Sequence, residues 1–326
     1  MTASHAAVPT DRSRFVRYLA AKKSIDDRSL NRHVRDCLAT ALAHDRPQPR
    51  PESLQVLEVG AGIGTMIERV LRWGLFPGAS YRAVDAEASN IEEARSRLPR
   101  WARDEGLSTK VHSDGSMVFG EGGEALRVRF VVGDALELAE SGEAQGWDLL
   151  IAHAFLDLID LPSGLPRLLM LLRPGGLFYA TLNFDGATIL QPSMDPDLDQ
   201  AVERLYHQTM DARRVHGKAS GDSRTGRHLF QRLAAAGVEI LASGASDWVV
   251  FPQSGAYPGD EAYFLQFIVQ TIESALAGHP DLDQERLPAW IRERKAQIER
   301  GELVYIAHQL DVLARIPAEH VAVRAA

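Results

Sequence analysis

A glycine-rich turn is the first part of this sequence whose residue types could do chemistry. The run Leu57-Glu58-Val59-Gly60-Ala61-Gly62-Ile63-Gly64 follows a short apolar stretch and precedes residues at helical spacing. Glycines at such a turn allow a positive φ and let a ligand approach the backbone closely. The helix that follows presents free N–H groups at its start. This turn therefore predicts a binding site for a nucleoside-type ligand.

Two carboxylates follow at the ends of the next two predicted strands. Asp85 stands 21 residues after Gly64, where a carboxylate can accept both hydroxyls of a ribose. Asp134 ends a later apolar run and could accept from an adenine amino group. The alternative is that these carboxylates only cap the helices that follow them. Together with the glycine turn, these acids place an expected group at the ends of three successive strands, which favours the nucleoside site.

The details of the turn distinguish between two kinds of cofactor. The dinucleotide fingerprint G-x-G-x-x-G requires glycine at a position that Thr65 occupies in this chain. Glu58 stands two residues before the first glycine, where a carboxylate would crowd a pyrophosphate. It suits a ligand that carries an ammonium and a sulfonium but no phosphate. The turn therefore favours S-adenosylmethionine over a nicotinamide dinucleotide.

At these residues the sequence resembles the class I S-adenosylmethionine-dependent methyltransferases. The family's first motif matches the glycine turn, its ribose-binding acid corresponds to Asp85, and its adenine-site pair corresponds to Asp134-Ala135. Trp147-Asp148 before the fourth strand and Leu172-Arg173-Pro174-Gly175-Gly176 before the fifth also match. The resemblance covers roughly residues 50–185. It implies a seven-stranded sheet whose last strand runs antiparallel, for which 303–310 is the candidate.

The resemblance also implies where S-adenosylmethionine would bind. Tyr18 lies on a predicted N-terminal helix, which in this family often covers the cofactor, although core packing explains it equally well. The expected cofactor-binding residues are Tyr18, Glu58, Gly60, Ala61, Gly62, Gly64, Asp85, Ala86, Asp134, Ala135, His153, Ala154 and Phe155.

His153 and Asp157 are the candidate catalytic residues, because they follow the fourth strand at the edge where open α/β sheets bind ligands. His153 could act as a general base, or it could form part of the cofactor wall through its backbone. Asp157 could orient an amine or assist His153, or it could be a charge at a helix start. The segment between them matches neither the Asn/Asp-Pro-Pro-Tyr nor the Leu-His-His pattern, so the acceptor stays open.

The surrounding pattern predicts an α/β fold, a Rossmann-like doubly wound sheet with N-terminal helices and helical cap insertions. Residues 1–50 are expected to form a helical lid segment, with Asp26 or Asp27 capping its second helix and a proline-rich linker at 46–51. Residues 51–326 are expected to form the methyltransferase domain. The predicted strands cover 54–59, 81–84, 128–132, 147–152, 176–182, 238–250 (with a break at Gly244) and 303–312. Later helices are predicted at 195–215, 260–277 and 284–300, in cap insertions near 186–226 and 254–300.

Composition narrows the class of protein. The 326-residue chain has a formal net charge of -8, which opposes binding to duplex DNA. Cys37 is the single cysteine, and no Cys/His cluster suggests a metal. Neither a signal peptide nor an apolar run long enough to span a membrane is present, so a cytoplasmic protein is expected. The excess of arginine over lysine hints at a GC-rich bacterial source.

The sequence therefore predicts an enzyme that transfers a methyl group from S-adenosylmethionine to an O or N atom of a small molecule by in-line displacement. No DNA or membrane partner is expected, and a homodimer is left open. The alternatives are a non-catalytic cofactor-binding protein of the same fold and an RNA methyltransferase. A basic stretch from Arg213 to His228 favours RNA, whereas the two cap insertions favour a small acceptor.

Overall fold

A single large sheet forms the centre of the protein. The computed structural model describes residues 12–44, 53–140, 146–215 and 217–318. The strands of this sheet lie in the order β10-β12-β7-β6-β1-β2-β5-β4-β3, and β11 pairs with β12. Their bounds are β1 (Gln55–Val59), β2 (Ser80–Asp85), β3 (Thr109–Val111), β4 (Met117–Phe119), β5 (Leu126–Val132), β6 (Trp147–His153), β7 (Leu172–Gln191), β10 (Glu239–Ala245), β11 (Trp248–Val250) and β12 (Val304–Arg315).

The middle of the sheet confirms the predicted Rossmann-like arrangement. Strands β5, β2, β1, β6 and β7 are parallel, and β12 runs antiparallel between β7 and β10. Val56 and Leu57 on β1 face two different cores, as buried parallel strands require. The predicted reversal of the last strand is therefore confirmed.

The seven predicted strands are present as β10, β12, β7, β6, β1, β2 and β5, and within the described residues the sheet has three more. A hairpin of β3 and β4 continues the sheet beyond β5, and β11 is a separate strand. The break before β11 falls at Ser246-Asp247 and not at Gly244, because the Asp247 carboxylate leaves the ladder to accept from the Gln309 N–H. The helix predicted at 195–215 ends at Asp211. A small hairpin of β8 (Arg214–Val215) and β9 (Lys218–Ala219) follows it.

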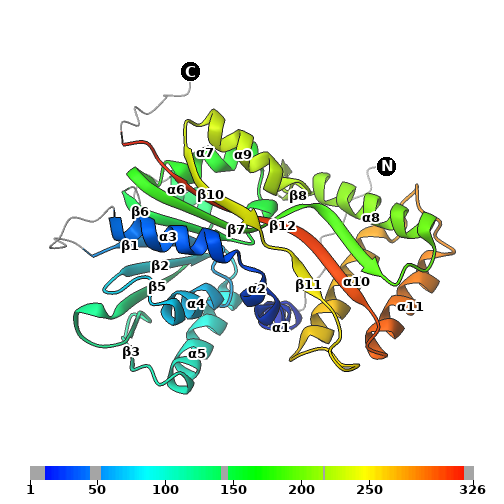
Figure 1. Ribbon diagram of the computed structural model, residues 1–326, viewed down its shortest axis with the longest axis horizontal. Helices are drawn as coiled ribbons and strands as arrows, with labels where there is room; N and C mark the ends of the chain where they lie inside the picture. The colour runs from blue at the N-terminus through cyan, green and yellow to red at the C-terminus, as the bar shows by residue number, and fades with distance from the viewer. Residues whose placement is uncertain (1–11, 45–52, 141–145, 216, 319–326) are drawn as a thin grey trace.

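Helices cover both faces of the sheet (Figure 1). One face packs against α3 (Arg32–His44), α4 (Thr65–Trp73) and α5 (Ala88–Asp104). The other face packs against α6 (Ala135–Glu140), α7 (Leu161–Leu169) and α9 (Thr225–Ala235). These two layers hold the parallel strands rigidly and align their carboxyl ends at one edge.

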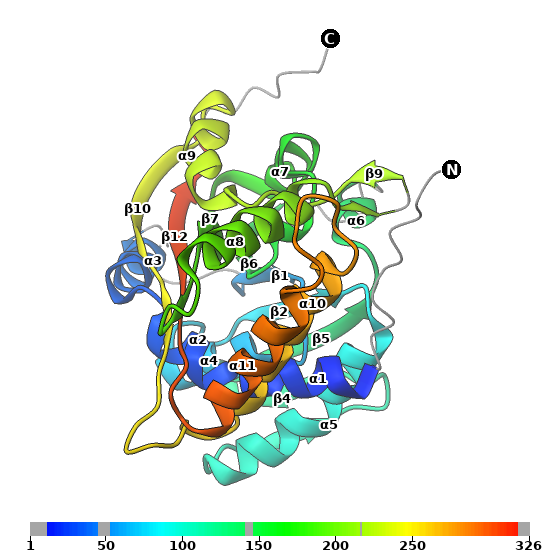
Figure 2. The same cartoon turned by 90° about the vertical axis from the view of Figure 1, so that its right-hand side faces the viewer.

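A third core joins the sheet to a helical cap. It packs α8 (Pro196–Asp211), α10 (Glu261–Leu276) and α11 (Leu287–Glu299) against the far halves of β7 and β12. Figure 2 shows α8, α10 and α11 side by side in front of the sheet. Leu182 and Phe184 of β7 and Tyr305 and Ala307 of β12 belong to this core. The two long strands therefore carry the cap beyond the parallel part of the sheet.

The N-terminal helices are α1 (Arg12–Ala21), α2 (Lys23–Ser29) and α3. The predicted helix cap at Asp26 or Asp27 is wrong, because both residues lie inside α2. Asn31 caps α3 instead: its Oδ1 accepts from the Val34 N–H at 3.1 Å, and its Nδ2 donates to the Ala245 carbonyl at 2.9 Å. The linker at 46–51 lies outside the described residues, so the boundary at residue 50 stays a prediction. None of the helices in the described ranges is long and apolar enough to cross a membrane.

We expect Asn31→Ala to lower the free energy of unfolding by about 1–2 kcal/mol, because the variant loses both the cap of α3 and the bond to β10. Urea unfolding followed by circular dichroism measures the change. Arg32→Ala is the matched control, since Arg32 is the next residue and its side chain is exposed. Equal costs for the two variants would contradict the capping role of Asn31.

Candidate functional site

A cavity of about 510 Å³ lies at the carboxyl edge of the parallel strands. The glycine turn, β2 and β6 form its floor, and residues of α1, α10 and β11 form its roof. Glu58 and Gly64 are not among the residues that line it. The expected site residues that do line it are Tyr18, Gly60, Ala61, Gly62, Asp85, Ala86, Asp134, Ala135, His153, Ala154, Phe155 and Asp157.

The glycines of the turn are required for different physical reasons. Gly60, Gly62 and Gly64 all have positive φ, at 67°, 54° and 80°. A Cβ on Gly60 would lie 2.5 Å from the Phe155 ring, and one on Gly64 would lie 2.9 Å from Leu98 on α5. A Cβ on Gly62 would meet only Leu19, at 3.6 Å, so Gly62 is limited mainly by its backbone. Gly64 therefore serves helix packing and not the cavity.

Asp85 holds the glycine turn in place. Its Oδ2 accepts from the Gly62 N–H at 2.7 Å, and its Oδ1 accepts from the Glu87 N–H at 2.9 Å and the Asn90 amide at 3.0 Å. A carboxylate oxygen can accept more than one hydrogen bond. Oδ2 therefore keeps acceptor capacity on a residue that lines the cavity.

Asp134 caps α6, as the alternative interpretation of this residue stated. Its Oδ1 accepts from the Leu136 N–H at 2.7 Å and the Glu137 N–H at 3.2 Å. The residue is exposed and also lines the cavity. Its expected contact with an adenine amino group stays a prediction.

Glu58 is buried on the side of β1 away from the cavity. Tyr81 donates a hydrogen bond to its Oε2 at 2.8 Å. Burial raises the pKa of Glu58 to about 8, although Tyr81 and Arg69 act in the opposite direction. Tyr81 therefore holds the Glu58 carboxyl in the core and not in the wall of the cavity.

The buried carboxylate of Asp26 contacts several residues that line the cavity. Its Oδ2 lies 2.7 Å from the Lys22 ammonium and 3.4 Å from the Arg69 guanidinium, and its Oδ1 accepts from the Trp248 indole at 3.0 Å. Burial alone would raise the pKa of Asp26, but Lys22, His153 and Arg69 outweigh it and hold the pKa well below its ordinary value. Asp26 is therefore ionised and fully paired, which a charge with no exposed surface requires.

His153 belongs to the same buried cluster. Its Nε2 lies 3.0 Å from Arg69 Nη1 and 3.3 Å from Asp26 Oδ2, and its Nδ1 lies 2.8 Å from the Thr181 hydroxyl. The Arg69 guanidinium can only donate to Nε2, whereas the ionised Asp26 carboxylate can only accept from it. Burial and the neighbouring Arg69 lower the pKa of His153 to about 4. The ring is neutral, and both of its nitrogens already have partners.

Asp157 has a free hydrogen-bond acceptor. Its Oδ1 is buried and has no partner among the described residues. Burial raises the pKa of this carboxyl, which the charge of Arg213 opposes. The Arg213 guanidinium donates to the backbone oxygen of Asp157 at 2.7 Å and so fixes the position of the residue. Asp157 therefore lines the cavity and has one buried carboxylate oxygen without a described partner.

The backbone is strained where the floor meets these groups. Ala154 and Leu182 have positive φ angles, 47° and 54°, which residues with a Cβ rarely adopt. Ala154 follows β6 directly, and its N–H donates to the Thr181 carbonyl at 2.8 Å. This turn directs the chain after His153 along the cavity. Such strain is concentrated at functional sites in proteins.

The roof contains residues that the sequence did not reveal as site residues. Tyr18 was expected at the site, but nothing in the spacing of Phe15 and Leu19 showed that their side chains also line the cavity. Tyr18 stacks on Phe267 of α10 with ring centroids 4.2 Å apart. The other roof residues that the sequence analysis missed are Lys22, Trp248, Ile268 and Thr271.

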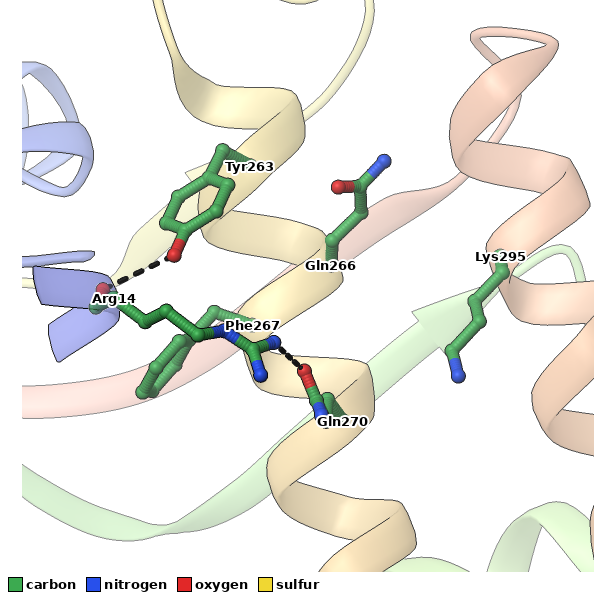
Figure 3. Close-up of a pocket in the computed structure, with 6 residues that line it drawn as sticks. All are labelled: Arg14, Tyr263, Gln266, Phe267, Gln270 and Lys295. Carbon is green, nitrogen blue, oxygen red and sulfur yellow. Dashed lines mark hydrogen bonds between the residues drawn. The ribbon is translucent and has the colours of Figure 1, made fainter. Parts of the chain in front are cut away.

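At the outer side of the roof, hydrogen bonds join α1 to α10. Figure 3 shows the Arg14 side chain directed to Gln270, and the Tyr263 hydroxyl donates to the Arg14 carbonyl at 3.1 Å. Lys295 on α11 pairs with Glu273 at 2.7 Å. The hollow between these side chains measures about 180 Å³, and both of its cationic side chains already have partners. These contacts therefore hold α1 against α10.

Within the part of the chain that the structure describes, no group of three or more His, Cys, Asp or Glu side chains could hold a metal ion.

The comparisons with known proteins give only distant likenesses. No family model and no curated protein matches the sequence. Among solved structures, the chain is similar to phosphoethanolamine N-methyltransferase 2 from Haemonchus contortus, at 13% identity and a TM-score of 0.40, over 86% of this chain and 52% of that one. It is similar to geranyl diphosphate C-methyltransferase from Streptomyces coelicolor, at 14% and 0.39, over 85% and 77%. It is also similar to the cyclase SpnF, at 17% and 0.39, over 86% and 80%.

At these identities the likeness concerns the fold alone, and the strand order describes the fold independently. Seven strands lie in the order β5-β2-β1-β6-β7-β12-β10, and β12, the last of them in sequence, is antiparallel as the resemblance implies. The chain has the fold of the class I methyltransferases. In this fold the glycine turn after β1 and the acids after β2 and β5 lie at one edge of the sheet, which is where the cavity lies.

The pH dependence of stability provides a test of the buried His153. Its folded pKa of about 4 lies below its ordinary value, so between about pH 6.5 and pH 4 the unfolded chain binds a proton that the folded chain does not. Its contribution to stability is complete above about pH 6.5 and falls as the pH drops. Between about pH 6.5 and 4.5, we expect the free energy of unfolding of wild type to fall by about 1.4 kcal/mol more per pH unit than that of His153→Gln. Urea unfolding at several pH values measures both slopes, and parallel slopes would contradict a buried neutral His153.

Proposed function

We propose that this protein transfers the methyl group of S-adenosylmethionine to an O or N atom of a small molecule. The observation that carries the proposal is the single cavity that joins the glycine turn, Asp85 and Asp134 under a closed roof. Its volume of about 510 Å³ lies within the usual range for small ligands and cofactors, roughly 300–1,000 Å³.

The residues around the cavity fit a nucleoside cofactor without phosphate. Asp85 offers acceptor capacity for ribose hydroxyls at the edge of β2. Lys22 is the one Lys or Arg among the described lining residues, and it is already bound to Asp26 at 2.7 Å. The lining therefore has no spare cation to neutralise a pyrophosphate, which supports S-adenosylmethionine over a dinucleotide.

When bound, S-adenosylmethionine supplies a methyl carbon that its sulfonium already activates. The chain then has to hold the donor and the acceptor in line and keep water away from them. The aromatic roof of Phe15, Tyr18, Trp248 and Phe267 supports the exclusion of water. Rigid positioning is consistent with the Asp26 cluster, which ties the roof to the floor.

We assign His153 to the wall of the cavity and Asp157 to the acceptor. His153 would have to give up its bond to Arg69 before its Nε2 could take a proton. Asp157 has a buried oxygen without a described partner and lies beside the same cavity. This supports Asp157 as the group that receives a proton or a hydrogen bond from the acceptor.

The surroundings of the basic stretch favour a small acceptor over RNA. Arg213 donates to the Ser220 and Asp157 backbone oxygens, Arg227 pairs with Asp185 at 2.7 Å, and His228 lies 2.7 Å from Asp222. His216 and the side chain of Lys218 lie outside the described residues. Three cations of the stretch are therefore occupied, which leaves fewer charges for a phosphate backbone.

A non-catalytic cofactor-binding protein remains the alternative function, because a fold does not determine an activity. Incubation with S-adenosylmethionine and a set of small amines, alcohols and phenols distinguishes the two. An acceptor product heavier by one CH2 group, formed together with S-adenosylhomocysteine, supports the enzyme. Binding of S-adenosylhomocysteine without turnover of any acceptor supports the alternative.

Asp85→Ala should weaken S-adenosylhomocysteine binding by about 10- to 1000-fold, because hydrogen bonds to a carboxylate contribute about 1.5–3 kcal/mol each. Isothermal titration calorimetry measures the change. Asp114→Ala is the control: Asp114 also accepts from the backbone N–H two residues ahead, at 2.9 Å, but it is exposed and does not line this cavity. A change of less than about threefold for Asp85→Ala would remove Asp85 from the site.

Gly62→Val should abolish S-adenosylhomocysteine binding while the protein still folds. Gly74→Val controls for backbone strain, because Gly74 has a similar φ of 62° and no atom within 4 Å of its added Cβ. Both variants should lose roughly 1–2 kcal/mol of stability through the positive φ. Thermal melting and calorimetry compare them. Retained binding in a folded Gly62→Val protein would show that the turn does not hold the cofactor.

A further inference from the structure

A second cavity opens beside the proposed cofactor site. It measures about 200 Å³ and lies between η2 (Leu156–Leu158), the far halves of β7 and β12, and the end of α8. The two cavities share wall residues, including Tyr18, Ala154, Asp157 and Trp248. A molecule in the second cavity would therefore lie next to a ligand in the first.

Five aromatic side chains line the second cavity. Leu182 and Met210 add aliphatic surface. Such walls bind a compact apolar body, and aromatic faces also attract a cation. The rings that line the cavity belong to Tyr18, Phe184, Tyr206, Trp248 and Tyr305.

Two polar groups of this cavity have a buried oxygen without a partner among the described residues. One is Oδ1 of Asp157, and the other is Oε1 of Gln309 on β12. A buried acceptor without a donor is unfavourable, so a ligand that brings a donor is stabilised there. The cavity therefore selects for a donor of hydrogen bonds.

The other polar residues of the cavity are already engaged. Arg213 donates to two backbone oxygens, Thr188 bonds to His207 at 2.9 Å, and the Asp222 carboxylate accepts from Arg224 N–H and lies 2.7 Å from His228. Within the part of the chain that the structure describes, none of these residues donates a hydrogen bond to the Asp157 carboxylate. A cation on the ligand would supply the missing partner for that carboxylate.

Resting on the proposed methyl transfer, we infer that the acceptor is a small amine whose apolar body fills the second cavity and whose nitrogen is held by Asp157. The ammonium gives one proton to the Asp157 carboxylate, which frees the nitrogen lone pair. That pair forms the N–C bond to the methyl carbon while the C–S bond breaks and its electron pair goes to sulfur. The products are a methylated ammonium, a neutral thioether and a protonated Asp157, which returns its proton to solvent. Burial, which raises the pKa of Asp157, suits this carboxyl to the proton it receives.

Matched amines and alcohols test the inference on protein saturated with S-adenosylhomocysteine. The probes are benzylamine with benzyl alcohol, 2-phenylethylamine with 2-phenylethanol, and 3-phenylpropylamine with 3-phenylpropanol, and calorimetry measures each Kd. At least one amine should bind about tenfold or more tightly than its alcohol. Asp157→Asn should abolish that preference and leave the Kd for S-adenosylhomocysteine and the melting temperature close to those of wild type.

Asp222→Asn is the matched control, because Asp222 lines the same cavity but its carboxylate is already bound. This variant should keep the preference for the amine. The inference is wrong if no amine binds, if every pair binds within about threefold, or if the preference survives Asp157→Asn. Failure of S-adenosylhomocysteine to bind wild type would overturn the proposed function as well. If S-adenosylhomocysteine binds but no amine is preferred, only the inference about the acceptor is overturned.

Discussion

One buried carboxylate determines how the parts of this protein enclose a cavity. Asp26 has no exposed surface, and its partners come from four segments: Lys22 from the N-terminal helices, Arg69 from α4, His153 from β6 and Trp248 from β11. Removing a partner from a buried ion pair costs about 3–5 kcal/mol, because an uncompensated charge remains. The cluster therefore fixes the distance between the floor of the cavity and its roof.

The long two-stranded ribbon of β7 and β12 supports the structure around the Asp26 cluster. Its inner half belongs to the two cores of the doubly wound sheet, and its outer half belongs to the core of the cap. The register shifts between the Ala307–Thr188 and Gln309–Phe184 pairs, where residues 185–187 of β7 stand opposite His308. The strands are paired on both sides of this bulge, so the ribbon extends from the floor of the first cavity to the walls of the second.

The sequence predicted the features that depend on local spacing. One such feature is the strand–turn–helix pattern at residues 55–73. The glycine turn lies close to the acids at the ends of β2 and β5 because parallel strands end at one edge of the sheet, which is a general property of the fold. The Asp26 cluster could not be predicted, because an aspartate before an apolar helical pattern is typical of a helix cap. Its true partners at 69, 153 and 248 are distant in sequence. The same holds for Asp157 and Gln309, whose unused oxygens become visible only when the packed neighbours are known.

The position of β12 also has a consequence for how the chain is made. This strand is the last of the sheet in sequence, yet it lies inside it, between β7 and β10. Until residues 304–315 have left the ribosome, β7 and β10 each have an unpaired edge, and the core of the cap lacks Tyr305 and Ala307. Unpaired edges are templates for association with other chains. The nascent protein is therefore most exposed to aggregation just before its synthesis reaches this strand, and a holding chaperone would act in that interval.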